Sequence, residues 1–295
     1  MNKKASDYDQ EVLDLFDLYV HSQINRREFL QGASKFAIGG LTATAILESL
    51  SPQYVQAKQV DENDPRLKSE YIEYSSPKGH GRIRGLLTRP AEASGKLPGV
   101  VVIHENRGLN PHIEDVSRRA GLEGFLVLGP DALTPLGGYP GTDDEGRDMQ
   151  RTLDRNEILE DFVSAVEYLK SHPDCTGKIG VVGFCFGGWV SNMLAVRLSY
   201  LNASVPFYGS QPTAEDVQKI NAPLLIHYAS LDNRVNKGWP DYESALKQYN
   251  KNYTVNFYEN VNHGFHNDTT PRYDEASAKL AWQRTVDFFN QYLKS

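Results

Sequence analysis

The chain has 295 residues, of which 40% are hydrophobic and 23% charged, a composition typical of a globular protein with one large domain and some additional sequence. Its formal net charge of −7 argues against a general nucleic-acid or anionic-membrane surface, since both favour clustered Lys and Arg. The two cysteines, Cys175 and Cys185, flank a predicted strand that holds them too far apart for a disulfide, so we expect two free thiols.

Residues 1–60 differ from the rest of the chain. Asp9 to Val20 has an acidic, helix-forming pattern, the pair Arg26-Arg27 follows, and then comes a mildly apolar run from Phe36 to Leu47. This arrangement resembles a twin-arginine export signal, with Val55-Gln56-Ala57 as a small-residue cleavage site. We therefore expect periplasmic export, with a cytoplasmic protein as the alternative. In that case the apolar run is a helix packing on a partner subunit or on the catalytic domain.

Strand patterns begin after a polar linker. Two segments separated by a turn-rich stretch predict a hairpin, and several short runs of branched residues then predict buried strands. The predicted strands are Tyr71–Ser75, Ile83–Thr88, Gly99–Ile103, Gly124–Leu128, Ile179–Val182, Ala203–Phe207, Leu224–His227 and Thr254–Tyr258.

Helical patterns alternate with these strands. The predicted helices include Glu157–Lys170, Trp239–Tyr249 and Glu275–Leu293. Strands alternating with helices predict a mostly parallel sheet with right-handed crossovers. Residues 61–295 are thus expected to form one α/β catalytic domain, preceded by an N-terminal helical extension or export signal.

The stretch Lys178 to Gly188 reads as a strand, a sharp turn and the start of a helix. Gly183-Phe184-Cys185-Phe186-Gly187 fits G-x-nucleophile-x-G, with a cysteine where serine is common. Glycines two residues before and after the nucleophile let the strand and helix backbones pass closely, and the helix N-terminus favours a thiolate. A buried structural cysteine is the alternative, so the motif needs partners.

Two later strand ends carry suitable partners. Asp232 follows the strand Leu224–His227, and His263 follows the strand Thr254–Tyr258. The order Cys185, Asp232, His263 is that of an α/β-hydrolase triad, in which the histidine moves protons and the aspartate orients it. His266 lies three residues further on and is the competing candidate base.

Another strand end supplies the expected oxyanion hole. Phe186, the residue after the nucleophile, gives one amide, and Asn106, in the loop after Gly99–Ile103, is the candidate for the second. The neighbouring Glu105 is unusual there, because a negative charge opposes oxyanion formation.

Together the G-F-C-F-G-G, H-E-N-R-G, L-D-N and N-H-G-F segments resemble the dienelactone hydrolase family over roughly residues 71–293. This resemblance implies an α/β-hydrolase fold and cofactor-free cleavage of a lactone or ester. It also implies that Glu105 contacts the resting thiol and swings away when substrate binds. The alternative is that Glu105 pairs with Arg107 or another basic side chain.

Substrate recognition departs from the family pattern. Well-known members hold a substrate carboxylate with arginines, one of them shortly after the catalytic histidine, whereas here Arg272 is the first arginine after it. Arg107, Arg147 and Arg151 are candidates for this role, with surface charge as the alternative for each. The Gly/Pro-rich loop 135–146, which contains Tyr139, is expected to form a pocket wall or lid.

These observations predict a cysteine-dependent hydrolase whose partner is a small-molecule ester or lactone. An acyltransferase or peptidase on the same triad is the nearest alternative, and a noncatalytic interaction protein on a hydrolase fold is a more distant one. We expect no cofactor and no metal, because the sequence contains no dinucleotide motif, no P-loop and no zinc-ligand spacing. A homo-oligomer formed through the extension is a further prediction.

Overall fold

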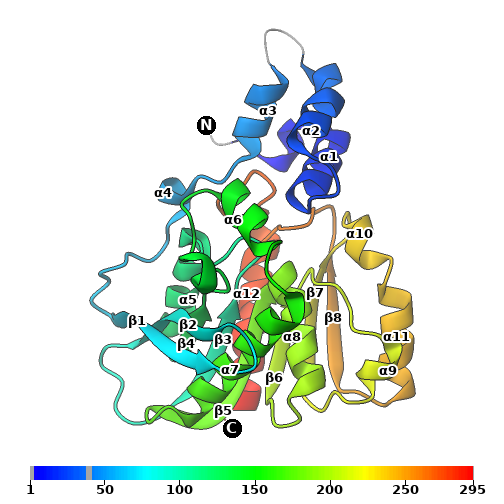
Figure 1. Cartoon of the computed structure of the whole chain (residues 1–295). Helices are drawn as coiled ribbons and strands as arrows, with labels where there is room; N and C mark the ends of the chain where they lie inside the picture. Colours follow the sequence, from blue (N-terminus) through cyan, green and yellow to red (C-terminus); the bar gives the residue numbers. More distant parts are fainter. Residues whose placement is uncertain (1–2, 38–41, 295) are drawn as a thin grey trace.

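The computed structural model of the chain describes residues 3–37 and 42–294 and contains a central eight-stranded sheet (Figure 1). The sheet begins with an antiparallel hairpin whose second strand pairs antiparallel with the fourth strand of the chain, and all further neighbours are parallel. In spatial order its strands are β1 (Leu67–Ser76), β2 (Gly81–Pro90), β4 (Leu126–Pro130), β3 (Leu97–Ile103), β5 (Cys175–Phe184), β6 (Ala203–Phe207), β7 (Leu224–Ala229) and β8 (Tyr253–Tyr258).

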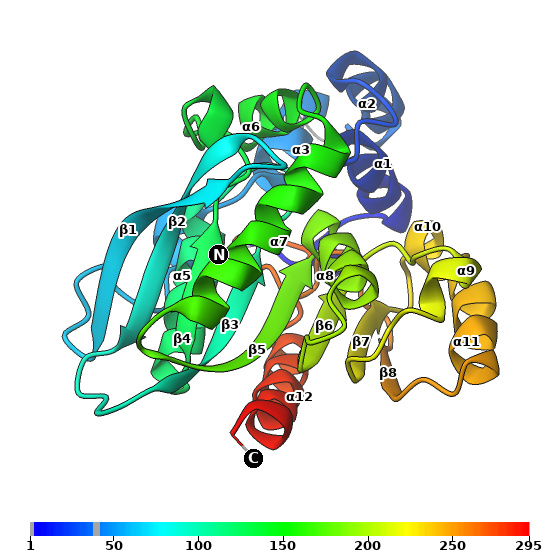
Figure 2. The same cartoon turned by 60° about the horizontal axis from the view of Figure 1, so that its bottom comes forward.

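Helices cover both faces of this sheet, as Figure 2 shows. One face packs against α5 (Pro111–Leu122) and α12 (Glu275–Leu293), and the other against α7 (Arg155–Ser171), α8 (Phe186–Arg197) and α11 (Trp239–Gln248). Alternate residues of β3 enter the two cores, with Val100 and Val102 on the α5 side and Val101 and Ile103 on the α7 side. The continuous branched run of this strand therefore reflects burial on both faces.

Short helices complete the catalytic domain, and several of them lie in the loops at the carboxyl ends of the strands. These are α6 (Asp143–Gln150), α9 (Ala214–Val217), α10 (Asn233–Asn236) and the 3-10 turn η3 (Thr134–Leu136). In this kind of sheet the carboxyl ends are where ligands bind.

The N-terminal extension forms a small helical unit with its own core. It contains η1 (Ala5–Asp7), α1 (Gln10–Val20), α2 (Arg26–Ala33), η2 (Ser34–Phe36), α3 (Ala43–Leu50) and α4 (Tyr54–Ala57). Phe29 of α2 and Leu50 of α3 are fully buried among apolar side chains of α1. In Figure 1 these helices sit at the top of the molecule, beside α6 and α10.

The paired arginines of the export prediction, Arg26 and Arg27, open helix α2. Of the predicted apolar run, residues 38–41 lie outside the described part of the chain, while Ile46 and Leu47 are buried in the core of the extension. Export stays a prediction from the sequence.

The linker after the extension is fixed to the catalytic domain. The carboxylate of Asp115 on α5 accepts hydrogen bonds from the backbone N–H groups of Gln59 and Val60, at 3.2 and 2.7 Å. Arg118 donates to the carbonyl of Val60 at 3.3 Å. The predicted polar linker is therefore an ordered connection along α5.

The α/β architecture is confirmed. The predicted strand Ala203–Phe207 and helix Glu275–Leu293 have the bounds observed for β6 and α12, while β1 and β5 extend further than predicted. Both cysteines are free, as expected, and both are buried. Among the described residues, no helix is long and apolar enough to cross a membrane.

Candidate active site

Cys185 lies on a strained turn between β5 and α8. Its backbone has φ 57° and ψ −110°, a left-handed conformation that is uncommon for a residue with a side chain. The flanking glycines are sterically required. A Cβ on Gly183 would lie 2.0 Å from the carbonyl oxygen of Gly187, and a Cβ on Gly187 would lie 2.4 Å from that of Ile103. The predicted elbow is therefore present.

His263 and Asp232 meet beside this turn. Asp232 follows β7 and caps α10, where one carboxylate oxygen accepts from the backbone N–H of Val235 at 3.1 Å. Its other oxygen accepts from Nδ1 of His263 at 2.5 Å, which leaves Nε2 of the ring available for chemistry. Both side chains are almost fully buried. The structure thus brings these two strand-end residues together, with a ring nitrogen of His263 within 4.8 Å of Sγ of Cys185.

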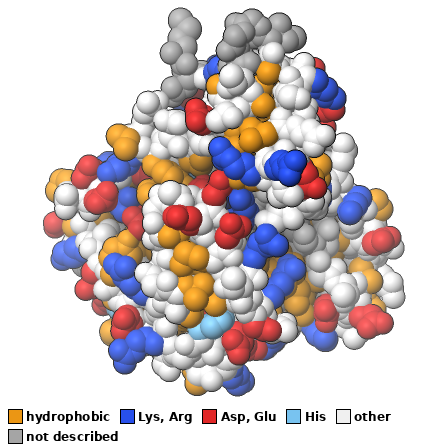
Figure 3. All heavy atoms as spheres, turned by 45° about the horizontal axis from the view of Figure 1, so that its top comes forward, with side chains coloured by type: hydrophobic (Ala, Val, Ile, Leu, Met, Phe, Trp, Pro, Cys, Tyr) orange, Lys and Arg blue, Asp and Glu red, His pale blue; other side chains and the backbone are white. Residues whose placement is uncertain are grey.

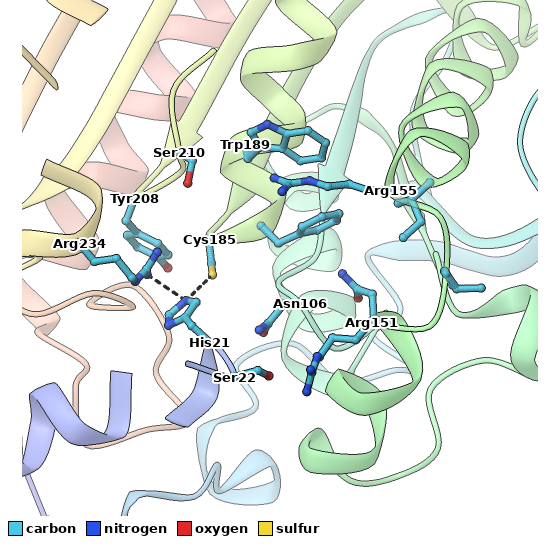
Figure 4. A pocket seen from close by; sticks show the side chains of 14 residues that line it. His21, Ser22, Asn106, Arg151, Arg155, Cys185, Trp189, Tyr208, Ser210 and Arg234 are labelled. Carbon is cyan, nitrogen blue, oxygen red and sulfur yellow. Dashed lines mark hydrogen bonds between the residues drawn. The ribbon is translucent and has the colours of Figure 1, made fainter. Parts of the chain in front are cut away.

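A second histidine, from the extension, also reaches the thiol. Nε2 of His21 lies 3.1 Å from Sγ of Cys185, and Figure 4 shows His21 entering the site from α1 between Cys185 and Arg234. One ring nitrogen of each histidine and Sγ all lie within 4.8 Å of one another. Nε2 of His263 has no hydrogen-bond partner, so the recorded hydrogen bond of the thiol goes to His21.

The electrostatics favour a thiolate. Burial opposes ionisation of Cys185, but the positive charges of His21 and His263 and the hydrogen bond from His21 lower the pKa of the thiol to about 5. Burial also opposes protonation of His263, yet the negative charges of Asp232, Cys185 and Asp17 raise its pKa to about 10. The site therefore holds a negative sulfur beside positive imidazole.

Two backbone amides are available for an oxyanion. Phe186 is the first residue of α8, and Asn106 lines the same cavity as Cys185. In the described turns and loops, neither backbone N–H is engaged in a recorded hydrogen bond. The side chain of Asn106 instead donates to the carbonyl of Val20 in the extension, at 2.8 Å.

Comparison with known proteins decides the family. Residues 83–293 match the model described as "Dienelactone hydrolase family". The chain belongs to the dienelactone hydrolase family. It is a hydrolase acting on ester or lactone bonds. A second model, described as "YqhI-like", matches residues 1–37.

Individual relatives agree with this assignment. A Saccharolobus solfataricus protein named "Putative carboxymethylenebutenolidase" is 30% identical over 251 residues, which covers 72% of this chain and 95% of that protein. An Escherichia coli K12 protein, "Putative hydrolase fragment YghX", is 54% identical over 114 residues, 39% of this chain and 97% of its own length. A crystal structure titled as a "Putative Dienelactone Hydrolase" from Klebsiella pneumoniae has a TM-score of 0.67 at 26% identity and covers 76% of this chain and all of that one.

Glu105 is not bonded to the thiol in this dienelactone hydrolase family member. It is buried, and its carboxylate accepts from Nδ2 of Asn267 at 3.1 Å and lies 3.7 Å from the guanidinium of Arg107. Burial opposes its ionisation, but the charges of Arg107 and His112 hold its pKa below the usual value. The alternative considered from the sequence, pairing with a basic side chain, matches the observed contacts.

The cavity beside Cys185 has a volume of about 440 Å³, a size typical of small-molecule sites. Three predicted substrate-binding residues lie outside its lining, because acidic residues of α6 hold them elsewhere. Arg107 and Tyr139 contact the carboxylate of Asp143, and Arg147 pairs with Asp144. Residues 135–146, predicted to form a wall of the pocket, do not line this cavity, and residues between 150 and 158 line it instead.

Besides Arg234, two further arginines, Arg151 and Arg155, line the cavity. Arg155 lies 3.6 Å above the ring of Trp189, and none of the salt bridges recorded for the described residues involves it. Within the described part of the chain, the one salt bridge recorded for Arg151 is to Asp148, at the long distance of 3.9 Å. On the face drawn in Figure 3, basic and acidic side chains are interspersed rather than gathered into one basic patch.

His266, the competing base, points away from the thiol. Its ring stacks on Phe184 with centroids 5.0 Å apart, and burial lowers its pKa well below the usual value. The cluster of His21, Cys185 and His263 also has the donor atoms of a metal site. However, Nη2 of Arg234 lies 3.0 and 3.2 Å from ring nitrogens of the two histidines, so its positive charge opposes a cation there.

The sequence prediction missed His21, Asp17 and Arg234. Asp17 lies in the predicted helical pattern Asp9 to Val20, and His21, four residues after Asp17, directly follows this pattern and is the C-cap of α1. The spacing did not indicate that these residues contact the catalytic loops. The extension was predicted to be an export signal, so no contact with the active site was expected. Arg234 lies two residues after Asp232 and bonds Asp17 at 2.9 Å.

Proposed function

We propose that Cys185 is the nucleophile of a cysteine-dependent ester or lactone hydrolase, with His263 as its base and Asp232 as the group that orients His263. The thiolate attacks the acyl carbon, a carbon–sulfur bond forms, and the carbon–oxygen bond to the leaving group breaks as the leaving oxygen takes a proton from an imidazolium beside the sulfur. Water then gives a proton to His263 and attacks the thioester carbon. The carbon–sulfur bond breaks, and the acid product leaves.

The oxyanion formed in both steps would be stabilised by the backbone N–H groups of Phe186 and Asn106. These amides come from the start of α8 and from the loop after β3. Pre-positioned amides that face developing charge are usually a large part of catalysis in this fold.

The observation that carries this proposal is the strained turn that presents Cys185 beside the hydrogen-bonded pair Asp232–His263. The test is turnover of p-nitrophenyl acetate by the wild type and by Cys185→Ala. Loss of turnover with an unchanged circular dichroism spectrum supports the proposal, and unchanged turnover contradicts it.

For the substrate, we propose an ester or lactone that carries a negatively charged group. Arg155 provides the support, because it lines the cavity without a carboxylate partner among the recorded salt bridges of the described residues. A Bradyrhizobium relative, 29% identical, is named as a lactonase of a propanoate. Arg155→Gln should raise KM for carboxylate-bearing esters and leave KM for neutral esters unchanged. An equal effect on both substrate classes contradicts the assignment.

An acyltransferase or peptidase using the same triad would form the same thioester. These reactions are outcomes of the same substrate screen, in which an amine or alcohol acceptor added with an ester is tested for transfer of the acyl group. Formation of the free acid alone supports hydrolysis.

A further inference from the structure

The extension brings a second aspartate–histidine pair to the thiol. His21 ends α1, and its Nδ1 donates to the carbonyl of Asp17 at 2.7 Å while also lying 3.2 Å from the carboxylate of the same residue. Its Nε2 lies 3.1 Å from Sγ of Cys185. The atoms thus follow the order carboxylate, Nδ1, Nε2 and sulfur, whereas in the Asp232–His263 pair the carboxylate contacts Nδ1 and Nε2 has no recorded partner.

The imidazole rings of the two pairs lie close together but differ in orientation. The imidazole rings of His21 and His263 lie edge to face, with centroids 4.7 Å apart and an interplanar angle of 87°. Because the hydrogen bond of the thiol goes to His21, Nε2 of His263 remains unpartnered. His263 is then free to meet a water molecule or a leaving group.

Charged contacts hold the second pair in place. The carboxylate of Asp17 accepts from Nε of Arg234 at 2.9 Å and pairs with Arg272 at 3.4 Å, both on the catalytic domain. Nη2 of Arg234 also lies 3.0 Å from Nε2 of His21. The charged or titratable groups facing His21 are therefore Asp17, Cys185, Arg234 and His263.

Three more hydrogen bonds fix α1 on the catalytic domain around this contact. They join Gln10 to Asn262 at 2.6 Å, Tyr19 to Asp144 at 2.6 Å and Asn106 to the carbonyl of Val20 at 2.8 Å. Since these partners lie on three separate segments of the catalytic domain, two loops and helix α6, the position of His21 is set by the whole docked helix.

We propose that His21 is a second catalytic base for Cys185 and that Asp17 positions it, so that the N-terminal extension forms part of the active site. The inference rests on the proposed function, in which Cys185 is the nucleophile. Its consequence is a division of the two proton transfers between two histidines.

In the resting site His21 already holds the thiol proton as an imidazolium. After the carbon–sulfur bond has formed, His21 gives this proton to the leaving oxygen as the carbon–oxygen bond breaks. With the sulfur acylated, its negative charge no longer raises the pKa of His263, and this ring releases its proton to solvent. His263 then takes a proton from water as hydroxide attacks the thioester, and the sulfur leaves as a thiolate. His21 regains a proton from solvent, so the sulfur and both histidines return to their starting charges.

The experiment compares His21→Gln, His21→Ala, Asp17→Asn and His263→Ala in the full-length chain. Glutamine at position 21 keeps a polar contact but cannot accept the thiol proton. Glu11→Gln is the matched control, because it removes a carboxylate from α1 at an exposed position paired with Lys35. The readouts are the burst of p-nitrophenol from p-nitrophenyl acetate, acetylation of Cys185 by mass spectrometry, and the pH dependence of Cys185 alkylation by iodoacetamide.

We expect both His21 variants to slow the burst about a hundredfold, within the usual range for loss of a general base. They should also raise the pKa of the Cys185 thiol by about 1 to 3, the effect of a lost neighbouring charge. His263→Ala should keep a burst and accumulate acetylated Cys185. Asp17→Asn should act like the His21 variants but more weakly, and Glu11→Gln should match the wild type.

The inference is overturned if His21→Gln has the burst rate and alkylation profile of the wild type, because a packing contact alone then explains His21. It is equally overturned if the His21 variants react faster, which would make the extension a block, or if protein from the native host begins after Ala57. These results leave Cys185 as the nucleophile. Turnover by Cys185→Ala would instead remove the proposed function itself, while the alkylation profiles of the other variants still report on His21.

Discussion

The two aspartate–histidine pairs at Cys185 are built in different ways. Asp232 and His263 lie on separate loops, so their distance is fixed only when β7 and β8 pair in register. Asp17 and His21 lie one helical turn apart, so helix formation alone brings them together, and docking of α1 delivers them to the sulfur. Pairing of strands in the sheet therefore assembles one pair, whereas the other pair depends on docking of helix α1 against the catalytic domain.

The largest effect should come from the atom that both pairs share. Cys185→Ala should lower kcat/KM by about 10⁴-fold or more, since loss of a nucleophile removes the function of its partners too. The measurement is steady-state hydrolysis of the best ester found by screening. Cys175→Ala, which removes the buried thiol at the start of β5, is the control and should retain activity.

The sheet-built pair should come next. Asp232→Asn should lower kcat/KM by about 10² to 10⁴-fold, because the amide no longer stabilises the imidazolium form of His263. Acetylated Cys185 should accumulate in this variant, as water activation slows. A loss of activity without any acetylated enzyme would contradict this assignment of His263.

The helix-built pair should be more tolerant. Asp17→Asn should lower kcat/KM by roughly tenfold to a hundredfold, the usual worth of one hydrogen bond to a charged group. Its contacts with Arg234 and Arg272 should also weaken, so added salt should reduce the activity of this variant further. Equal losses for Asp17→Asn and Asp232→Asn would erase the distinction between the two pairs.

The pH dependence of alkylation tests both pairs together. The pKa of Cys185 in the folded protein is about 5, below the usual value of a thiol, so the thiolate persists above pH 5 and is lost as the pH falls through it. The rate of alkylation by iodoacetamide should therefore reach half its plateau near pH 5. A midpoint near the usual pKa of a free thiol would show that the imidazoles do not stabilise the thiolate.

The extension and the catalytic domain have separate hydrophobic cores, so a core substitution in the extension should lower the activity slightly without destabilising the catalytic domain. Phe29 lies in the core of the extension and Phe162 in that of the catalytic domain, and both are fully buried. Phe162→Ala should destabilise the whole catalytic domain by about 3 to 5 kcal/mol. Phe29→Ala should leave the main thermal transition in place and only lower kcat/KM, as α1 loosens. A single shared transition lowered equally by both would show one cooperative unit.

The sequence was sufficient for the catalytic sheet because its signals are local. Continuous branched runs marked β3 and β5, and each predicted triad residue directly follows a strand or the turn after it. Parallel strands bring such positions to one edge whatever the loop lengths, so Cys185, Asp232 and His263 could be placed together from their order alone.

The lining of the substrate pocket and the contact of His21 with Cys185 depend on interactions between residues far apart in the sequence. Arg107 and Tyr139 were expected at the substrate, but both side chains contact the buried carboxylate of Asp143 instead. Burial opposes ionisation of Asp143, yet the charge of Arg107 and the hydrogen bonds to the carboxylate hold its pKa below the usual value. His21 lies 164 positions from Cys185 in the sequence, and no periodicity encodes that contact. The position at which a helix docks depends on side chains from several distant segments, and the sequence alone does not show that these segments lie together.

The ordered linker along α5 has a kinetic consequence. Asp115 fixes the backbone at Gln59 and Val60, so the extension is tethered close to the site even at moments when α1 detaches. A short tether keeps a detached group at an effective concentration of the order of millimolar, so rebinding is intramolecular and independent of protein concentration. A separate peptide carrying residues 1–57 would lack this tether. It should therefore restore the contact with the active site only when it is added at a concentration of the order of millimolar.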